Sequence, residues 1–223
     1  MRAREIELIP QPGIRLGATF SLPEAPRGVV LFAHGSGSSR FSSRNRYVAG
    51  ALQGQGLATV LMDLLTAAEE EEERFTRHHR FDIRLLAGRL LAAVRWVAEE
   101  AETEGLPIGL FGASTGAAAA LVAAAQDPRR VAAVVSRGGR PDLAGAALPG
   151  VRAPTLLIVG GADPEVLDLN REALGALRCE KALRIVPGAT HLFEEEGALE
   201  QVAALAAQWF IDHLAPAAQP GRS

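Results

Sequence analysis

Hydrophobic and polar residues alternate at the start of the chain. The alternation runs from Glu5 to Ile9 and, after a turn at Pro12 and Gly13, again from Ile14 to Leu22. A period of two is typical of strands with one buried face. The pattern therefore predicts an antiparallel pair of strands that caps one edge of a sheet.

Beyond Gly28 the apolar residues form short continuous runs, which are typical of strands buried on both faces of a parallel sheet. The predicted buried strands are VVLFA, LATVLMDLL, the run before Gly112, VAAVVS, APTLLIVGG and ALRIVPG. Stretches with helical spacing separate these runs. They are residues 47–53, a strongly amphipathic stretch from Asp82 that ends before Gly105, the alanine-rich stretch after Gly116, and residues 164–177 and 198–214.

This alternation of strands and helices predicts one α/β domain over residues 1–223, with a mostly parallel sheet and helices on both of its faces. The core is expected over residues 28–214, and residues 215–223 are expected to be a frayed, flexible tail. In such sheets functional side chains gather where strands end. Polar residues that directly follow the apolar runs are therefore the candidates for chemistry.

Five consecutive acidic residues, Glu69 to Glu73, are followed by the charged stretch RFTRHHR. A run of charge of this kind is typical of a solvated segment. The sequence predicts a loop or the start of a helix here, too charged to enter the core and without a function of its own.

Composition narrows the class of protein. The net charge is -3 and the pI is near 6.0, whereas a nucleic-acid surface requires clustered basic residues. Cys179 is the only cysteine, which excludes an internal disulfide and a cysteine-based zinc site and suits a reducing compartment. No apolar stretch approaches the ~20 residues that span a bilayer, and MRAREIELIPQ lacks the apolar segment of a signal peptide. We expect a cytoplasmic protein without membrane or nucleic-acid partners.

The stretch GASTG follows the apolar run that ends at Phe111 and precedes the alanine-rich helix. It has the form G-x-S-x-G, in which a serine on a sharp strand-to-helix turn exposes its hydroxyl. We expect Gly112 and Gly116 to lie where the strand and the helix pass too closely for a side chain. Ser114 is thus a candidate nucleophile, although a simple glycine-bounded turn has the same sequence.

A serine nucleophile needs a base and a carboxylate that orients the base. Among the histidines, only His191 lies in a loop directly after a late core strand; His34 is expected to brace its own loop, and the other three to lie at the surface. Asp163 follows TLLIVGG, so its carboxylate is expected at the same sheet edge, with capping of the next helix as the alternative role and Asp168 as the second choice of acid. The chain order Ser, Asp, His is that of α/β-hydrolases.

The motifs HGSGSS, GASTG, GGADPEV and GATHLF, in this order, resemble the α/β-hydrolase superfamily and, at this small size, its dienelactone hydrolase-like branch. The resemblance implies Ser114 as nucleophile, His191 as general base and acid, and Asp163 as orienting carboxylate. It also implies an oxyanion hole formed by the backbone N–H groups of Ser36 and Thr115. The short segment from Arg137 to Val151 implies that no cap domain is present. The namesake enzymes have cysteine where Ser114 stands.

Several arginines follow the strands that bear these motifs. Arg40, Arg44 and Arg46 follow the first buried strand, and Arg137 and Arg140 follow the strand after the nucleophile. Guanidinium groups bind carboxylate or phosphate, so Arg40, Arg44, Arg137 and Arg140 are candidates for binding an anionic substrate. The alternative is that they pair with the acidic run or with solvent.

Together these observations predict a serine hydrolase that cleaves a small ester, thioester or lactone in an open pocket, without a metal or cofactor. Two alternatives stay open: an acyltransferase or peracid-forming enzyme that uses the same triad, and a non-catalytic binding protein on a hydrolase fold. The sequence predicts neither the natural acyl group nor the oligomeric state.

Overall fold

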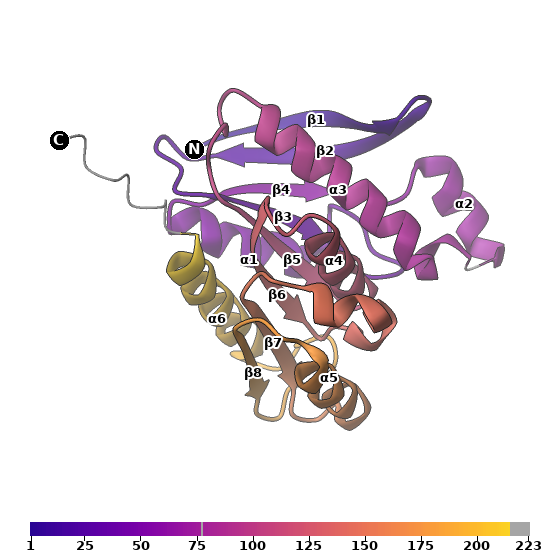
Figure 1. Ribbon diagram of the computed structural model, residues 1–223, viewed down its shortest axis with the longest axis vertical. Helices are drawn as coiled ribbons and strands as arrows, with labels where there is room; N and C mark the ends of the chain where they lie inside the picture. Colours follow the sequence, from indigo (N-terminus) through magenta and orange to yellow (C-terminus); the bar gives the residue numbers. More distant parts are fainter. Residues whose placement is uncertain (77, 215–223) are drawn as a thin grey trace.

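One eight-stranded sheet forms the centre of the molecule (Figure 1). The computed structural model describes residues 1–76 and 78–214. The strand order is β1-β2-β4-β3-β5-β6-β7-β8. The strands are β1 (Arg2–Gln11), β2 (Ile14–Leu22), β3 (Val29–Ala33), β4 (Ala58–Met62), β5 (Ile108–Ala113), β6 (Val131–Arg137), β7 (Thr155–Gly160) and β8 (Lys181–Val186).

The pairing of the strands matches the two sequence patterns. β1 and β2 form an antiparallel hairpin, and β2 pairs antiparallel with β4. From β4 to β8 every neighbouring pair is parallel. All five residues of β3 and of β4 are buried, as expected of strands covered on both faces. The predicted fold class, a mostly parallel sheet with an antiparallel N-terminal pair, is confirmed.

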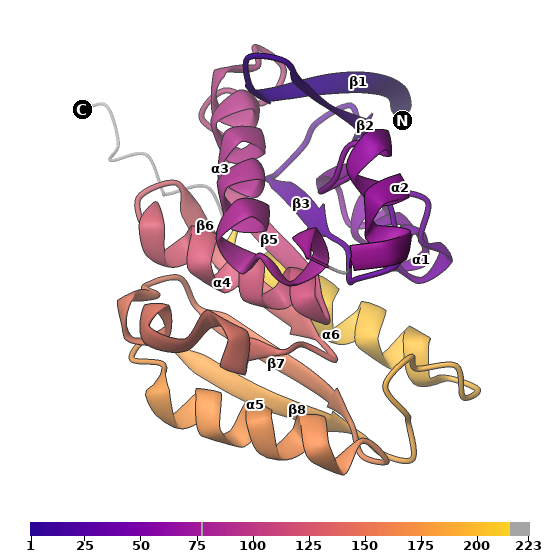
Figure 2. The same cartoon turned by 90° about the vertical axis from the view of Figure 1, so that its right-hand side faces the viewer.

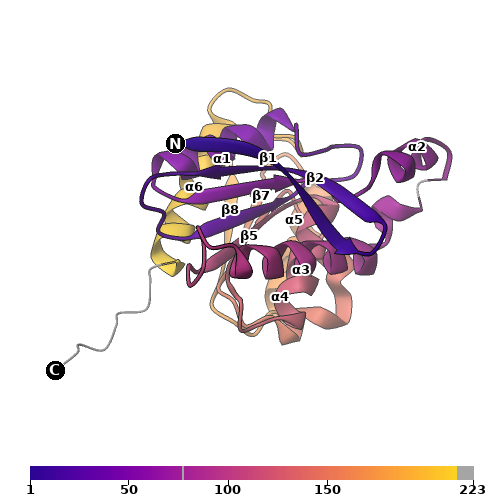
Figure 3. The same ribbon diagram turned by 90° about the horizontal axis from the view of Figure 1, so that it is seen from above.

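Helices cover both faces of this sheet (Figure 3). They are α1 (Ser43–Gly54), α2 (Ala67–Thr76), α3 (Ile83–Glu99), α4 (Thr115–Gln126), α5 (Pro164–Ala176) and α6 (Ala198–His213), with the 3-10 segments η1 (His79–Phe81) and η2 (Pro141–Gly150). Figure 2 shows α3, α4 and α5 side by side along one face, and α1 and α6 pack on the other. The connection from β6 to β7 is the short η2, which packs on α4 and α5, so no cap domain stands over the sheet.

Two element boundaries differ from the prediction. α1 begins at Ser43 rather than at residue 47, because the Ser42 hydroxyl caps it by accepting a hydrogen bond from the N–H of Asn45. β1 extends from Arg2, beyond the alternating stretch, since the hairpin pairing with β2 continues to its last residue, Leu22. The predicted tail, residues 215–223, lies outside the described residues.

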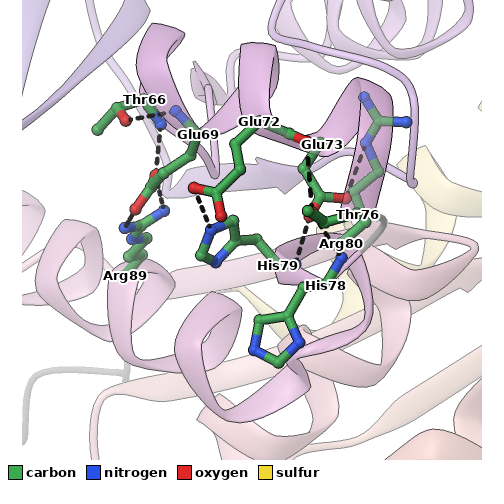
Figure 4. A network of polar contacts seen from close by, with 9 residues as sticks. All are labelled: Thr66, Glu69, Glu72, Glu73, Thr76, His78, His79, Arg80 and Arg89. Carbon is green, nitrogen blue, oxygen red and sulfur yellow. Dashed lines mark hydrogen bonds and ion pairs between the residues drawn. The ribbon is translucent and has the colours of Figure 1, made fainter.

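The acidic run forms most of helix α2, and the prediction that it is too charged for the core is wrong for Glu73, which is 1% exposed. Burial is possible because the turn after α2 folds back. The Glu73 carboxylate accepts a hydrogen bond from the N–H of His79 and lies 3.4 Å from Arg80 Nε (Figure 4). These partners compensate the loss of water around the charge.

Glu69, at the start of the same run, binds an arginine of α3. Its carboxylate receives two hydrogen bonds, of 2.5 and 2.7 Å, from the buried Arg89 (Figure 4). Arg89 also donates a bond of 2.7 Å to the carbonyl of Leu64, just after β4. The acidic run thus fastens α2 to α3 and to the edge of the sheet where strands end.

Candidate active site

Ser114 stands on a strained turn between β5 and α4. Its φ of 50° and ψ of -120° lie in a region that residues other than glycine rarely adopt. A side chain at Gly112 would come within 2.4 Å of Ala117 Cα, and one at Gly116 within 2.3 Å of the Ala33 carbonyl oxygen. The expected close approach of β5 and α4 is confirmed at Gly112, whereas at Gly116 the close neighbour is β3 rather than β5. The turn holds the Ser114 side chain, which is partly exposed, at the carboxyl end of β5.

His191 and Asp163 meet at the same sheet edge, in the loops after β8 and β7. The imidazole Nδ1 lies 2.7 Å from Asp163 Oδ2. Asp163 makes no side-chain capping bond to α5, although it occupies the N-cap position, so its carboxylate serves His191 instead. Asp168, the second choice of acid, is exposed and pairs with Arg171 at 2.9 Å. With Nδ1–H donated to Asp163, Nε2 is left to accept a proton.

Ser114 and His191 line one cavity of about 230 Å³, and the other histidines lie outside it. No hydrogen bond joins the Ser114 hydroxyl to the imidazole within residues 1–76 and 78–214. In enzymes without substrate, such bonds are often long and tighten only when the reacting complex forms. The structure therefore brings the three residues together without closing the contact between nucleophile and base.

The loop after β3 packs directly on this turn. A side chain at Gly35 would lie 3.0 Å from Ser114 Cβ. The N–H of Ser36 donates a 3.0 Å hydrogen bond to Thr115 Oγ1, so in this conformation it points at that hydroxyl. The N–H of Thr115 is at the first position of α4, where it has no acceptor within the helix. The two predicted oxyanion donors are adjacent, and one of them has a competing partner.

His34 braces this loop, as expected. Burial lowers the pKa of its imidazole, which favours the neutral form. Its Nε2 accepts a 3.0 Å hydrogen bond from the N–H of Leu64, and its Nδ1 lies 2.9 Å from the Gly35 carbonyl. The loop is thereby fixed between β4 and the Ser114 turn.

The candidate arginines divide into two pairs, and Arg40 and Arg140 do not line the cavity. Arg40 forms an ion pair with Asp63 and a longer one, 3.4 Å, with Glu5. Arg140 makes two hydrogen bonds to Asp142, of 2.7 and 2.8 Å. Both guanidinium groups are thus already neutralised by carboxylates. These carboxylates do not belong to the acidic run at residues 69–73, which was the alternative partner considered from the sequence.

Arg44 and Arg137 do line the cavity, beside Ser114 and His191. Arg44 pairs at the rim with the exposed Glu194, at 3.1 Å. Arg137 is 7% exposed, and no hydrogen bond or ion pair joins its guanidinium to a described residue. Its Cζ lies 5.8 Å from the centre of the Phe193 ring. Burial, and secondarily the charge of Arg44, lower the pKa of Arg137 to about 10.

Ser38, Ser42 and Asn45 also line the cavity, and none of them was predicted from the sequence. Ser42 caps α1, and Asn45 is 2% exposed in its first turn. Serine is a preferred N-cap residue, and this was the one signal in the sequence that could have placed the beginning of α1 at Ser43. Among the described residues, no group of three or more His, Cys, Asp or Glu side chains has a metal-binding arrangement. No helix in the described part of the chain is both long and apolar enough to cross a membrane.

Comparison with known proteins places these features in context. The model of the dienelactone hydrolase family matches residues 16–215. A dienelactone hydrolase from Anabaena variabilis is 55% identical, with a TM-score of 0.93 over 96% of this chain and 98% of that one. Est1E from Butyrivibrio proteoclasticus is 16% identical with a TM-score of 0.77, covering 94% and 98% of the two chains, a likeness of fold alone.

Two relatives from Mycobacterium tuberculosis strains carry a different name, "Putative phosphoribosyl transferase". Each is 58% identical over 215 residues, which are 96% of this chain but 47% of the relative. The chain therefore spans about half the length of these relatives.

Proposed function

The chain belongs to the dienelactone hydrolase family, and from this premise we propose that it is a hydrolase that cleaves a carboxylic ester, thioester or lactone with the triad Ser114, His191 and Asp163. The observation that carries the proposal is the 2.7 Å contact between His191 Nδ1 and Asp163 Oδ2, in the loops that flank the cavity of Ser114. This pairing fixes the imidazole tautomer that a serine nucleophile requires.

In the proposed reaction, the Ser114 hydroxyl attacks the acyl carbon while His191 Nε2 takes its proton. The N–H of Thr115, and that of Ser36 when it leaves the Thr115 hydroxyl, stabilise the negative oxygen of the tetrahedral intermediate. The alcohol or thiol then leaves with the proton from His191, and an acyl-enzyme remains. Water repeats the sequence and releases the acid and Ser114. These steps use this chain's own side chains and amides and need no metal or cofactor.

The test is hydrolysis of 4-nitrophenyl acetate by Ser114→Ala. We expect this variant to keep the fold, measured by circular dichroism, and to lose at least ~10³-fold in kcat. Ser43→Ala is the matched control, because Ser43 is an exposed serine on α1 that does not line the cavity. A fluorophosphonate probe should label Ser114 in the wild type. Unchanged turnover by Ser114→Ala would refute the proposal, and lack of labelling would favour a non-catalytic binding protein.

Two finer points belong to the same proposal. The substrate is a small acyl compound, and the acceptor is water rather than another alcohol or peroxide, which product analysis with competing acceptors measures. The cytoplasm is the proposed location, since Cys179 is the only cysteine. We further propose that the phosphoribosyl transfer in the names of the mycobacterial relatives belongs to the half of those proteins that this chain does not match.

A further inference from the structure

One part of the cavity wall is the beginning of a helix. Ser42, Arg44 and Asn45, at the N-cap and in the first turn of the twelve-residue helix α1, line the cavity together with Ser114 and His191. The free N–H groups and the dipole at a helix start favour an anion. The hydroxyls of Ser38 and Ser42 lie on the same wall and add hydrogen-bond donors.

Arg137 supplies an independent sign that an anion belongs here. Its side chain is more than nine-tenths buried, lines the same cavity, and has no hydrogen-bond or ion-pair partner among the described residues. A buried charge without a partner is unfavourable for the folded protein, so such groups are concentrated at functional sites. The described lining of the cavity contains no Asp or Glu that could neutralise this charge.

Arg137 also stands very close to the nucleophile. Its Cα is paired in register with that of Ala113, the residue before Ser114, across β5 and β6. The N–H of Ser114 donates a 3.3 Å hydrogen bond to the Arg137 carbonyl. Because Arg137 and Ser114 also line the same cavity of about 230 Å³, one small substrate can place an anion on the guanidinium and its acyl group at the Ser114 hydroxyl.

We propose that this cavity binds the phosphate group of a phosphorylated acyl substrate, held by Arg137, Arg44 and the start of α1. The inference rests on the proposed hydrolase function and adds a substrate class to it. A carboxylate offers two oxygens in one plane and is satisfied by one guanidinium. Here the donors come from two arginines, two serine hydroxyls and a helix start, and this arrangement suits a tetrahedral group with three terminal oxygens and two negative charges.

The test compares three 4-nitrophenyl esters that share a short acyl chain and differ at its end: 3-phosphonopropanoate, hemisuccinate and butanoate. We expect kcat/KM for the phosphonate to be about tenfold higher than for the carboxylate, and kcat/KM for the carboxylate to be about tenfold higher than for the neutral ester. Each step adds at least one charge-assisted hydrogen bond, and about 1.4 kcal/mol of binding free energy corresponds to a factor of ten. Equal or higher kcat/KM for the carboxylate would overturn the assignment of phosphate. A preference for the neutral ester would overturn the anion site altogether.

Two variants assign the effect to residues. Arg137→Met and Arg44→Met should each lower the ratio of phosphonate to butanoate hydrolysis, by at least ~tenfold for Arg137. The control is Arg130→Gln, which removes the same charge from an exposed arginine just before β6, where it pairs with Asp127. An unchanged ratio in both cavity variants would contradict the proposal.

Binding of inorganic phosphate separates this inference from the proposed reaction. Calorimetry on the Ser114→Ala protein should show phosphate binding that is lost when Arg137→Met is added. If the wild type cleaves no ester but phosphate still binds through Arg137, the hydrolase proposal fails and the phosphate site stands. If esters are cleaved but phosphate does not bind, the phosphate site fails and the hydrolase stands.

Discussion

At the scale of single residues, Arg137 is expected to destabilise the fold and, in our proposal, binds the anionic group of the substrate. Burial without a partner disfavours the charged guanidinium in the folded state and lowers its pKa from the ordinary value of an arginine to about 10. Replacement of such a group by an apolar side chain of similar size removes the unfavourable desolvation. We therefore expect Arg137, which we assign to substrate binding, to lower the stability of the folded protein.

Arg137→Met is accordingly expected to raise the free energy of unfolding by about 1–2 kcal/mol at pH 7. Because the folded-state pKa of this basic group is depressed, the disadvantage of wild-type Arg137 is fully present below about pH 10, and it disappears as the pH rises from there towards the ordinary pKa of an arginine. The advantage of the variant should therefore shrink above pH 10. Urea unfolding at pH 7 and at pH 10.5 measures both effects. A variant less stable than wild type at pH 7 would show that Arg137 stabilises the fold.

The difference between Arg137 and Arg140 shows what the sequence can predict about the site. Position after a strand selected Ser114, Asp163 and His191, and the structure places all three at one edge of the sheet, because the ends of parallel strands share that edge. The same rule selected both arginines. It could not separate them, since Arg137 is the last residue of β6 and lines the cavity, whereas the backbone has turned away by Arg140, which meets Asp142.

At the scale of elements, helix α2 depends on ionised side chains to stay in place. Partial burial alone would raise the pKa of Glu69, but hydrogen bonds from Arg89 and from the N–H of Thr66 outweigh it and lower the pKa from 4.5 to about 2. Arg89 is 4% exposed and has no carboxylate partner besides Glu69 among the described residues. Loss of this one contact leaves a buried charge between α2, α3 and the sheet.

Glu69→Ala should therefore lower the free energy of unfolding by about 2 kcal/mol at pH 7. Because the folded-state pKa of this acid is depressed, its contribution is complete above about pH 4.5 and is lost as the pH falls towards 2. The difference between wild type and variant should shrink over that range. Glu72→Ala is the control, because Glu72 is an exposed member of the same run whose contact with His79, at 3.4 Å, is long and exposed. Denaturant titrations at pH 7, 4 and 3 provide the measurement, and a difference independent of pH would contradict the role given to Glu69.

Elements with a regular pattern were predictable, and those fixed by distant partners were not. The spacing of Ile83, Leu86, Leu90, Val94 and Val97 identified α3, because an amphipathic helix on a sheet needs little else. The burial of Glu73 depends instead on the N–H of His79, which reaches it only after the chain turns back. A run of like charges does not reveal which member finds such a partner.

At the scale of the whole molecule, we expect strand β1 and the proposed active site to be separate in their effects. β1 buries Leu8 against the core, and its Arg2 and Arg4 pair with Glu102 beyond the end of α3. It contributes no residue to the cavity of Ser114. The model of the family begins at residue 16, after β1 has ended.

Removal of residues 1–12 is expected to leave kcat/KM for 4-nitrophenyl acetate unchanged. The truncated protein should unfold about 5 °C lower, since it loses the burial of Leu8 and the pairing of β2. The free edge of β2 should also promote aggregation. Thermal unfolding, light scattering and steady-state kinetics measure the three effects. Loss of activity in a protein that remains folded and monodisperse would show that the hairpin supports the site.

The order of the proposed triad residues along the chain has a consequence for synthesis on the ribosome. Ser114 and Asp163 are made before His191, and α6 follows all three residues. Until then Phe32 and Phe111, on the face of the sheet that Phe210 and its helix cover, remain open to water. Before His191 and α6 have been made, the nascent chain therefore lacks its proposed general base and exposes an apolar face that can aggregate. Completion of α6 ends both conditions within a few seconds of translation.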